Sequence, residues 1–218
     1  MAVLLDVDGT LIDSNDAHAR AWVDVGREAG LGIAFDEVRW LVGMGGDRVL
    51  PRLTGLDTAS AEGAAVLERR GEIFRRDYLP SLRAFPGARA LLERLLERGH
   101  TLVVATSASE EDMNALLDQA KLSDLLRYQT SSDDAESSKP APDIVEAALR
   151  RGGVHPMQAL MLGDTPYDVE AARNAGVPTV AVLCGGWTPL SLSGAREVYT
   201  DPADIVAHFE ASAFARKL

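Results

Sequence analysis

The segment Asp6-Val7-Asp8-Gly9-Thr10-Leu11 carries two aspartates separated by one residue, directly after an apolar run. Residues two apart in a strand point in similar directions, so one carboxylate is free to attack while the other moves a proton. Gly9 permits a sharp turn and a close approach of backbone N–H groups to an anion. An Asp-x-Asp pair alone is more typical of a turn that ends a strand, so other segments must decide.

Three further segments hold residue types that bind or activate phosphate. The hydroxyls of Thr106 and Ser107 could bind phosphoryl oxygens. Lys139 could neutralise phosphate charge and hold a nucleophilic carboxylate in place. Asp164, in the segment Gly163-Asp164-Thr165-Pro166-Tyr167-Asp168, is the kind of carboxylate that magnesium prefers together with water and substrate oxygens.

Each of these segments also has a purely structural explanation. Ser109 and Asp112 have the spacing of a helix-capping box, and Thr165 and Asp168 have the same spacing with Pro166 at the first helical position. A lysine in a loop is most often simply solvated. The positions of the segments relative to strands therefore decide between the two interpretations.

Buried parallel strands are indicated by apolar runs ahead of the reactive segments. The runs cover Val3–Val7, Leu102–Ala105, Ala159–Leu162 and Thr179–Leu183. Amphipathic helical patterns lie between them, which predicts an α/β fold with a doubly wound parallel sheet and right-handed crossovers. The reactive segments would then converge at the carboxyl ends of the strands, where such sheets bind ligands. That convergence favours a catalytic or ligand-binding role for these segments over a purely structural role in helix capping.

Residues 15–83 break the alternation, because they show helical patterns without a convincing strand. We expect the Ser14 side chain to cap the first helix, and further helices near 36–42, 46–53 and 59–78. We therefore predict two domains, a core formed by residues 1–14 and 84–218 and an inserted helical cap formed by residues 15–83.

Composition narrows the possible partners. The 218 residues carry 22 Lys and Arg against 33 Asp and Glu, and the formal charge of −11 disfavours binding to nucleic acid or to an anionic membrane. No long apolar span or secretory leader is recognisable, so we expect a cytoplasmic location. Cys184 is the lone cysteine, which excludes an internal disulfide. A small phosphorylated metabolite is the expected partner, and the oligomeric state stays open.

Together the four segments resemble the motifs of the haloacid dehalogenase superfamily, in its branch of phosphoglycolate phosphatases and β-phosphoglucomutases. The matching motifs are Asp6-Val7-Asp8-Gly9-Thr10, Thr106-Ser107, Lys139 and Gly163 to Asp168. The resemblance implies a Rossmann-like core with an inserted cap, and a phosphatase that depends on Mg²⁺. It also implies that Asp6 attacks phosphorus to give an aspartyl-phosphate while Asp8 acts as acid and then as base.

The resemblance implies roles for the other motif residues as well. The metal ligands would be Asp6, the backbone carbonyl of Asp8, and Asp164, and Asp168 would bind the metal or orient its water. The phosphoryl oxygens would be held by Gly9, Thr106, Ser107 and Lys139. A dehalogenase is disfavoured, because it has no need of the leaving-group acid that Asp8 supplies.

A phosphosugar mutase is the first alternative. His18 and Trp22 follow the first motif at the distance of the mutase pattern, although a histidine sharing a helix face with Trp22 can equally be a packing residue. The segment Gly43–Asp47 has glycine where a mutase would need a phosphate-binding arginine, and Arg48 lies close by. His18, Trp22 and Arg48 are thus the candidates for substrate contacts from the cap.

The sequence therefore predicts a magnesium-dependent phosphatase that hydrolyses a small-molecule phosphate monoester beneath a mobile cap. A non-catalytic phosphate-binding module is the second alternative, but such a module would tolerate loss of the motifs and none is missing. The ester itself is left open, because periodicity does not specify which cap side chains reach the cleft.

Overall fold

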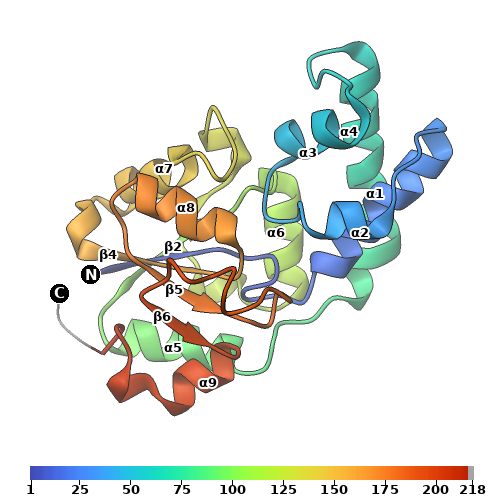
Figure 1. Ribbon diagram of the computed structural model, residues 1–218. Coiled ribbons are helices and arrows are strands. Elements are labelled where there is room, and N and C mark those ends of the chain that lie inside the picture. Colours follow the sequence, from blue (N-terminus) through green and yellow to red (C-terminus); the bar gives the residue numbers. More distant parts are fainter. Residues whose placement is uncertain (216–218) are drawn as a thin grey trace.

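A six-stranded parallel sheet forms the centre of the molecule in the computed structural model, which describes residues 1–215 (Figure 1). The strands are β1 (Ala2–Leu5), β2 (Thr101–Ala105), β3 (Tyr128–Thr130), β4 (Ala159–Gly163), β5 (Thr179–Val182) and β6 (Glu197–Tyr199). Their order is β3-β2-β1-β4-β5-β6, which confirms the predicted doubly wound α/β fold. The last three positions of the predicted core, 216–218, lie outside the described residues.

Helices cover both faces of the sheet (Figure 1). Val3 and Leu5 of β1 pack into the layer that contains α5 (Ala88–Glu97), α6 (Glu110–Gln119) and α9 (Pro202–Ala207). Ala2 and Leu4 pack on the other side, against α7 (Asp143–Gly152) and α8 (Pro166–Asn174). Because alternate residues are buried on opposite faces, the strands read as continuous apolar runs.

Residues 15–81, which we call the helical segment, contribute no strand to the sheet and extend from one end of it (Figure 1). The segment contains α1 (Asn15–Ala29), α2 (Phe35–Arg39), α3 (Gly46–Thr54), α4 (Ala61–Ile73), a π-helical stretch (Phe74–Tyr78) and a 3-10 turn (Leu79–Ser81). The predicted helices are confirmed with shifted ends. Four more 3-10 turns lie in the rest of the described chain, at Ser123–Leu125, Ser132–Asp134, Pro156–Gln158 and Phe209–Ala211.

The two connections between the helical segment and the sheet run side by side. Ile12 and Ala84 form an antiparallel bridge. The Phe85 N–H donates to the Leu11 carbonyl at 2.9 Å, and the Asp13 N–H donates to the Arg83 carbonyl at 3.1 Å. The whole insertion therefore leaves and re-enters the core at one narrow place.

The structure corrects three details of the prediction. Ser14 occupies the N-cap position of α1 but makes no capping hydrogen bond, because its hydroxyl donates instead to Asp8 Oδ1 at 2.5 Å. A hydrogen bond to an ionised carboxylate is stronger than a neutral cap. Strands β3 and β6 were not predicted, since each spans three residues at an edge of the sheet and is only partly buried.

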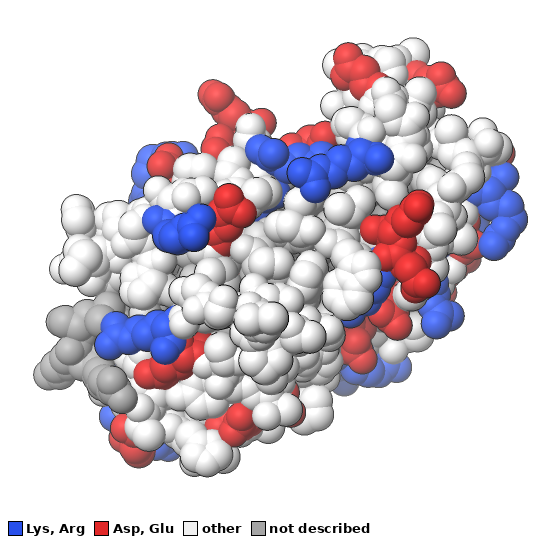
Figure 2. Space-filling model, viewed as in Figure 1, with Lys and Arg blue, Asp and Glu red and all other residues white. Residues whose placement is uncertain are grey.

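No helix among residues 1–215 has the length and apolar composition needed to cross a membrane. The face shown in Figure 2 carries small groups of both charge signs separated by uncharged surface.

Replacing Leu5 by Ala should lower the free energy of unfolding by about 2–5 kcal/mol, because the side chain is fully buried at the end of β1 and its loss leaves a cavity. Urea unfolding followed by circular dichroism measures the change. Leu190→Ala is the matched control, because Leu190 is 83% exposed and should change the stability by less than about 0.5 kcal/mol. Equal effects of the two substitutions would contradict the placement of β1 in the core.

Candidate active site

Acidic side chains gather where β1 and β4 end side by side. Asp6 follows β1 and Asp164 follows β4, and the Asp6 N–H donates to the Leu162 carbonyl at 3.0 Å. The strand order reverses direction between these two strands, which is where open α/β sheets leave a crevice for ligands. Two of the four predicted segments are thus brought together by the sheet itself.

Lys139 joins the third segment to this point. Its ammonium group lies 2.6 Å from Asp6 Oδ1 and 2.7 Å from Asp168 Oδ1, and all three side chains are buried. Burial opposes the charge of Lys139, but Asp168 and Asp6 outweigh it and raise the pKa of the ammonium group. Lys139 is therefore a fixed cation, and the interpretation as a solvated loop lysine is excluded.

Asp164 is oriented by two neighbours. The Thr10 hydroxyl donates to Asp6 Oδ2 at 2.9 Å and also lies 3.0 Å from Asp164 Oδ1. The Asn15 side-chain amide donates to Asp164 Oδ2 at 3.0 Å and to the Gly185 carbonyl at 3.1 Å. Asn15 was missed by the sequence reasoning, and its position one residue after Ser14, at the start of α1, is the signal that could have revealed it.

Gly9 is required at its position for two reasons. Its φ is +78°, a left-handed conformation that side chains other than glycine rarely adopt. A Cβ atom there would lie 2.2 Å from Asn15 Nδ2 and 2.3 Å from Asp164 Oδ2, which is far inside van der Waals contact. Glycine at this position lets the loop after β1 pass directly over the Asp164 carboxylate.

The carboxylates of Asp6, Asp164 and Asp168 repel one another when no metal ion lies between them. Burial raises the pKa of Asp6 to about 7, with Lys139 opposing the rise and Asp168 adding to it. Burial and the charges of Asp6 and Asp168 raise the pKa of Asp164 well above its ordinary value. One oxygen from each of these three aspartates lies within 4.8 Å of the other two, which suits a divalent cation with oxygen ligands. The donor set therefore fits magnesium.

Asp8 has a different environment from Asp6. The Ser14 hydroxyl and the His18 Nε2–H donate to the same oxygen, Asp8 Oδ1, at 2.5 and 2.6 Å. Burial acts to raise the pKa of Asp8, but these partners outweigh it and the pKa lies below its ordinary value. Among the described residues none hydrogen-bonds to Oδ2, so that oxygen is left for a reacting group in the cavity that Asp8 lines.

His18 is itself held by the helical segment. The Arg70 guanidinium contacts His18 Nδ1, and the imidazole stacks on Phe74 with ring centroids 4.1 Å apart. A guanidinium group can only donate, so Nδ1 accepts and the ring proton lies on Nε2, facing Asp8. The candidate His18 thus reaches the Asp8 carboxylate directly and is not only a packing residue.

Thr106 and Ser107 lie beside the carboxylates, at the end of β2. Both line a cavity of about 730 Å³ together with Asp6 and Asp8. The Thr106 hydroxyl accepts the Ala108 N–H at 3.1 Å, while the Ser107 hydroxyl is buried without a partner among the described residues. An unpaired buried hydroxyl at this place suits a ligand oxygen.

The helical segment forms the opposite wall of the cavity. Of the predicted candidates for substrate contact, Trp22 and His18 line it, whereas Arg48 is not among the lining residues. The remaining lining residues on this wall are Val38, Val42, Gly43, Met44, Gly45, Gly46, Asp47, Val49, Leu67, Glu68, Arg70, Gly71, Glu72 and Arg75.

The predicted glycine-rich segment Gly43–Asp47 touches the core. A Cβ atom on Gly45 would lie 2.0 Å from Ser138 Oγ, and one on Gly43 would lie 2.7 Å from Thr165 Cγ2. Asp47 Oδ2 accepts the Ser138 N–H at 3.2 Å. The glycines therefore allow this backbone to sit directly on the loop that carries Lys139.

A buried carboxylate beside a fixed ammonium group, with two further aspartates close by at the reversal point of a parallel sheet, suits metal-assisted phosphoryl transfer. Residues 3–182 match the family model described as haloacid dehalogenase-like hydrolase, and the chain belongs to this family. Its relatives and its fold identify it as a phosphoric monoester hydrolase of that family, in agreement with the sequence prediction.

Three similar proteins illustrate the relationship. A phosphoglycolate phosphatase from Rhodospirillum rubrum is 35% identical over 214 residues, which cover 94% of this chain and 88% of the relative. The crystal structure of a hydrolase from Pseudomonas syringae has a TM-score of 0.90 at 30% identity, covering 98% of this chain and 99% of that one. A β-phosphoglucomutase from Clostridium difficile shares the fold, with a TM-score of 0.84 at 18% identity over 98% and 96% of the two chains.

Asp164→Asn should abolish stabilisation by magnesium. In the wild type, saturating Mg²⁺ should raise the melting temperature, because a ligand at about 100 times its Kd stabilises by about 2.7 kcal/mol. The variant should melt at or above the temperature of the metal-free wild type, since it loses a buried charge that the other carboxylates repel. Differential scanning fluorimetry with and without Mg²⁺ measures both effects.

Asp118→Asn serves as the control, because Asp118 is exposed on α6 and lies away from the cavity. It should keep the full magnesium response. An undiminished response in Asp164→Asn would show that the cation binds elsewhere.

Proposed function

We propose that the protein hydrolyses small-molecule phosphate monoesters with the help of Mg²⁺, through an aspartyl-phosphate on Asp6. The observation that carries this proposal is the buried ion pair at 2.6 Å between Lys139 and Asp6, at the reversal point of the sheet. A lysine held in this way favours the ionised form of the Asp6 carboxylate, orients it, and would neutralise charge on the incoming phosphate.

In the first half-reaction an Asp6 oxygen attacks phosphorus and the ester oxygen leaves. Thr10 and Lys139 fix the two oxygens of the Asp6 carboxylate, so that the attacking group loses little freedom on binding. Thr106, Ser107 and the backbone at Gly9 would hold the phosphoryl oxygens on the other side.

Asp8 would exchange protons with the ester and with water. Its Oδ1 is fixed by Ser14 and His18, which turns the other oxygen toward the cavity. Asp8, protonated when the substrate binds, would give its proton to the leaving oxygen and, after the alcohol has left, take one from the water that attacks the aspartyl-phosphate. The lowered pKa of Asp8 suits the second step, because the carboxylate is then ionised and ready to accept.

Asp6, Asp164 and the Asp8 backbone carbonyl would hold the magnesium ion, which supplies charge neutralisation for the phosphate and the attacking carboxylate. We assign a positioning role to Asp168. Its Oδ1 pairs with Lys139 at 2.7 Å, and its Oδ2 accepts the N–H and the hydroxyl of Thr165 at 3.0 and 2.7 Å. With both oxygens engaged, Asp168 would anchor Lys139 and cap α8.

Residues 15–83 would act as a cap domain over a core formed by residues 1–14 and 84–218. The paired connections at Ile12 and Ala84 support a hinge, since one narrow place links the two parts. Closure would exclude water from the cavity and opening would release product. The acidic net charge and the lone cysteine fit an enzyme of small cytoplasmic metabolites.

Asp6→Asn should lower the rate of phosphate release by at least about a thousandfold while the protein stays folded, because it removes the attacking carboxylate with little change in volume. Phosphate release from a panel of small phosphate monoesters in the presence of Mg²⁺ is the assay. Circular dichroism checks the fold.

Asp13→Asn is the matched control, since Asp13 is exposed at the hinge and its hydrogen bond to Arg83 uses only the backbone. It should retain wild-type turnover. A rate of phosphate release by Asp6→Asn within tenfold of the wild-type rate would contradict the assignment of Asp6 as the nucleophile.

A further inference from the structure

We propose, on the basis of the function proposed above, that the cavity selects monoesters whose leaving group is uncharged and hydroxylated, and that it discriminates against esters bearing a second anionic group. The observation behind this inference is the pairing state of the charged side chains that line the cavity beyond the phosphate site.

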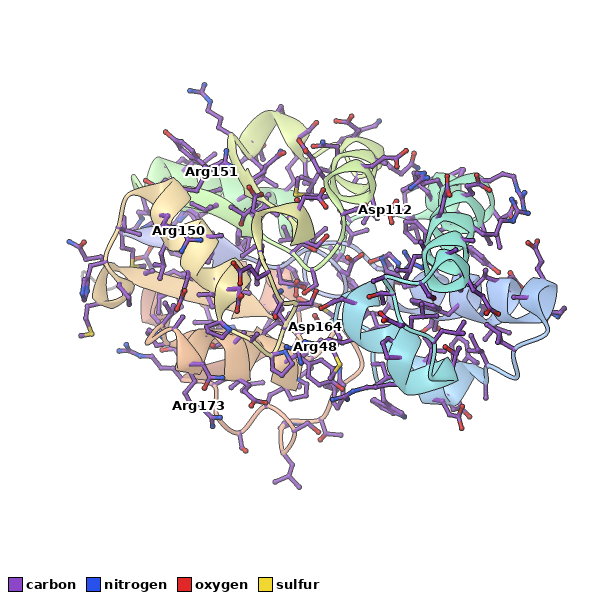
Figure 3. The ribbon with its side chains drawn as sticks, turned by 90° about the horizontal axis from the view of Figure 1, so that it is seen from above. Arg48, Asp112, Arg150, Arg151, Asp164 and Arg173 are labelled. Carbon is purple, nitrogen blue, oxygen red and sulfur yellow. The ribbon has the colours of Figure 1, made fainter. Side chains whose placement is uncertain are left out.

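The basic side chains of the cavity are already occupied. Among the described residues that line it, Arg70 and Arg75 are the arginines and no lysine is present. Both donate to Asp112 of α6, Arg70 at 3.3 Å and Arg75 at 2.7 Å. In Figure 3 Asp112 lies between α6 and the helices of the helical segment. One buried carboxylate thus binds both of the guanidinium groups that a ligand anion would need.

The remaining donors of these arginines are also restricted. Arg70 contacts His18 through a second nitrogen, and its Nε, which has no partner among the described residues, is buried away from the cavity solvent. Arg75 makes an additional ion pair of 3.1 Å with Glu111. An anionic leaving group would therefore have to displace existing ion pairs before it could gain one of its own.

Unpaired acidic side chains line two different parts of the same cavity. Glu68 lies on α4, and Glu136 lies on the loop before Lys139. Neither has a hydrogen-bond or ion-pair partner among the described residues, and both are exposed to the cavity solvent. Free carboxylates repel a second anion but accept hydrogen bonds from hydroxyl groups, as a sugar or polyol would offer.

The cavity is also larger than a two-carbon leaving group needs. Its volume is about 730 Å³, within the range of sites that enclose much larger ligands. Trp22, Met44, Val49 and Leu67 supply apolar wall, which suits the carbon faces of a sugar. The size of the cavity and the charge of its walls together favour the monophosphate of an uncharged polyol or sugar. They disfavour both phosphoglycolate and a bisphosphate.

The test compares two esters of nearly equal size, 2-phosphoglycolate and 2-hydroxyethyl phosphate, which differ by a carboxylate in place of a hydroxymethyl group. At low ionic strength kcat/KM should be at least about fivefold higher for 2-hydroxyethyl phosphate, whose leaving group is uncharged. Hexose 6-phosphates should be better still, and hexose 1,6-bisphosphate should be poor. Added salt should narrow the difference between the two small esters, because it screens the repulsion.

The double variant Glu68→Gln and Glu136→Gln should shift the ratio of the two kcat/KM values at least about threefold toward 2-phosphoglycolate. The control is Glu62→Gln with Glu170→Gln, which removes the same charge from α4 and α8 at residues that do not line the cavity. The control should leave the ratio unchanged.

The outcomes separate the two proposals. If the wild-type protein hydrolyses none of these esters, the result would count against the phosphatase mechanism itself. Turnover with a preference for 2-phosphoglycolate, or a ratio that the double variant does not shift, would overturn the charge selection and leave the mechanism standing.

Discussion

The ammonium group of Lys139 holds together an arrangement of charges that would otherwise repel. It lies within 2.7 Å of both Asp6 and Asp168, and burial together with the charges of these two aspartates raises the pKa of the nearby Asp164. A buried lysine can be kept charged only by such partners, and the partners can be kept buried only by the lysine. The close packing of carboxylates that destabilises the site is also what suits it to a divalent cation.

The two aspartates after β1 have opposite environments although one residue separates them. Burial among carboxylates raises the pKa of Asp6, whereas Ser14 and His18 lower that of Asp8. Such divergence separates the roles of paired acids in active sites. The partners of Asp6 come from the core, whereas Asp8 is bound by Ser14, directly before the helical segment, and by His18 within it. Asp8 is therefore coupled to the part of the chain that we propose to move.

The sequence predicted the features that depend on a local pattern of residues. It did not predict the features that depend on contacts between residues far apart in the chain. Apolar runs revealed β1, β2, β4 and β5, and their ends located the reactive segments, because strand ends in a parallel sheet must converge. The edge strands β3 and β6 are too short to give a pattern. The contacts of Asn15 with Asp164 and of Arg70 with His18 could not be predicted, since these partners lie 149 and 52 positions apart and meet only in the folded chain. Ser14 was expected to cap α1, and a carboxylate six residues earlier recruited it instead.

Chemical trapping of the phosphorylated enzyme tests the central claim most directly. Enzyme mixed with a rapidly hydrolysed monoester and Mg²⁺ would be quenched in acid within the first turnover, digested and analysed by mass spectrometry. A phosphoryl group on Asp6 is the predicted result, because acid preserves an acyl phosphate long enough for detection. Phosphate release with Asp6 unmodified and the phosphoryl group on another residue would contradict the account.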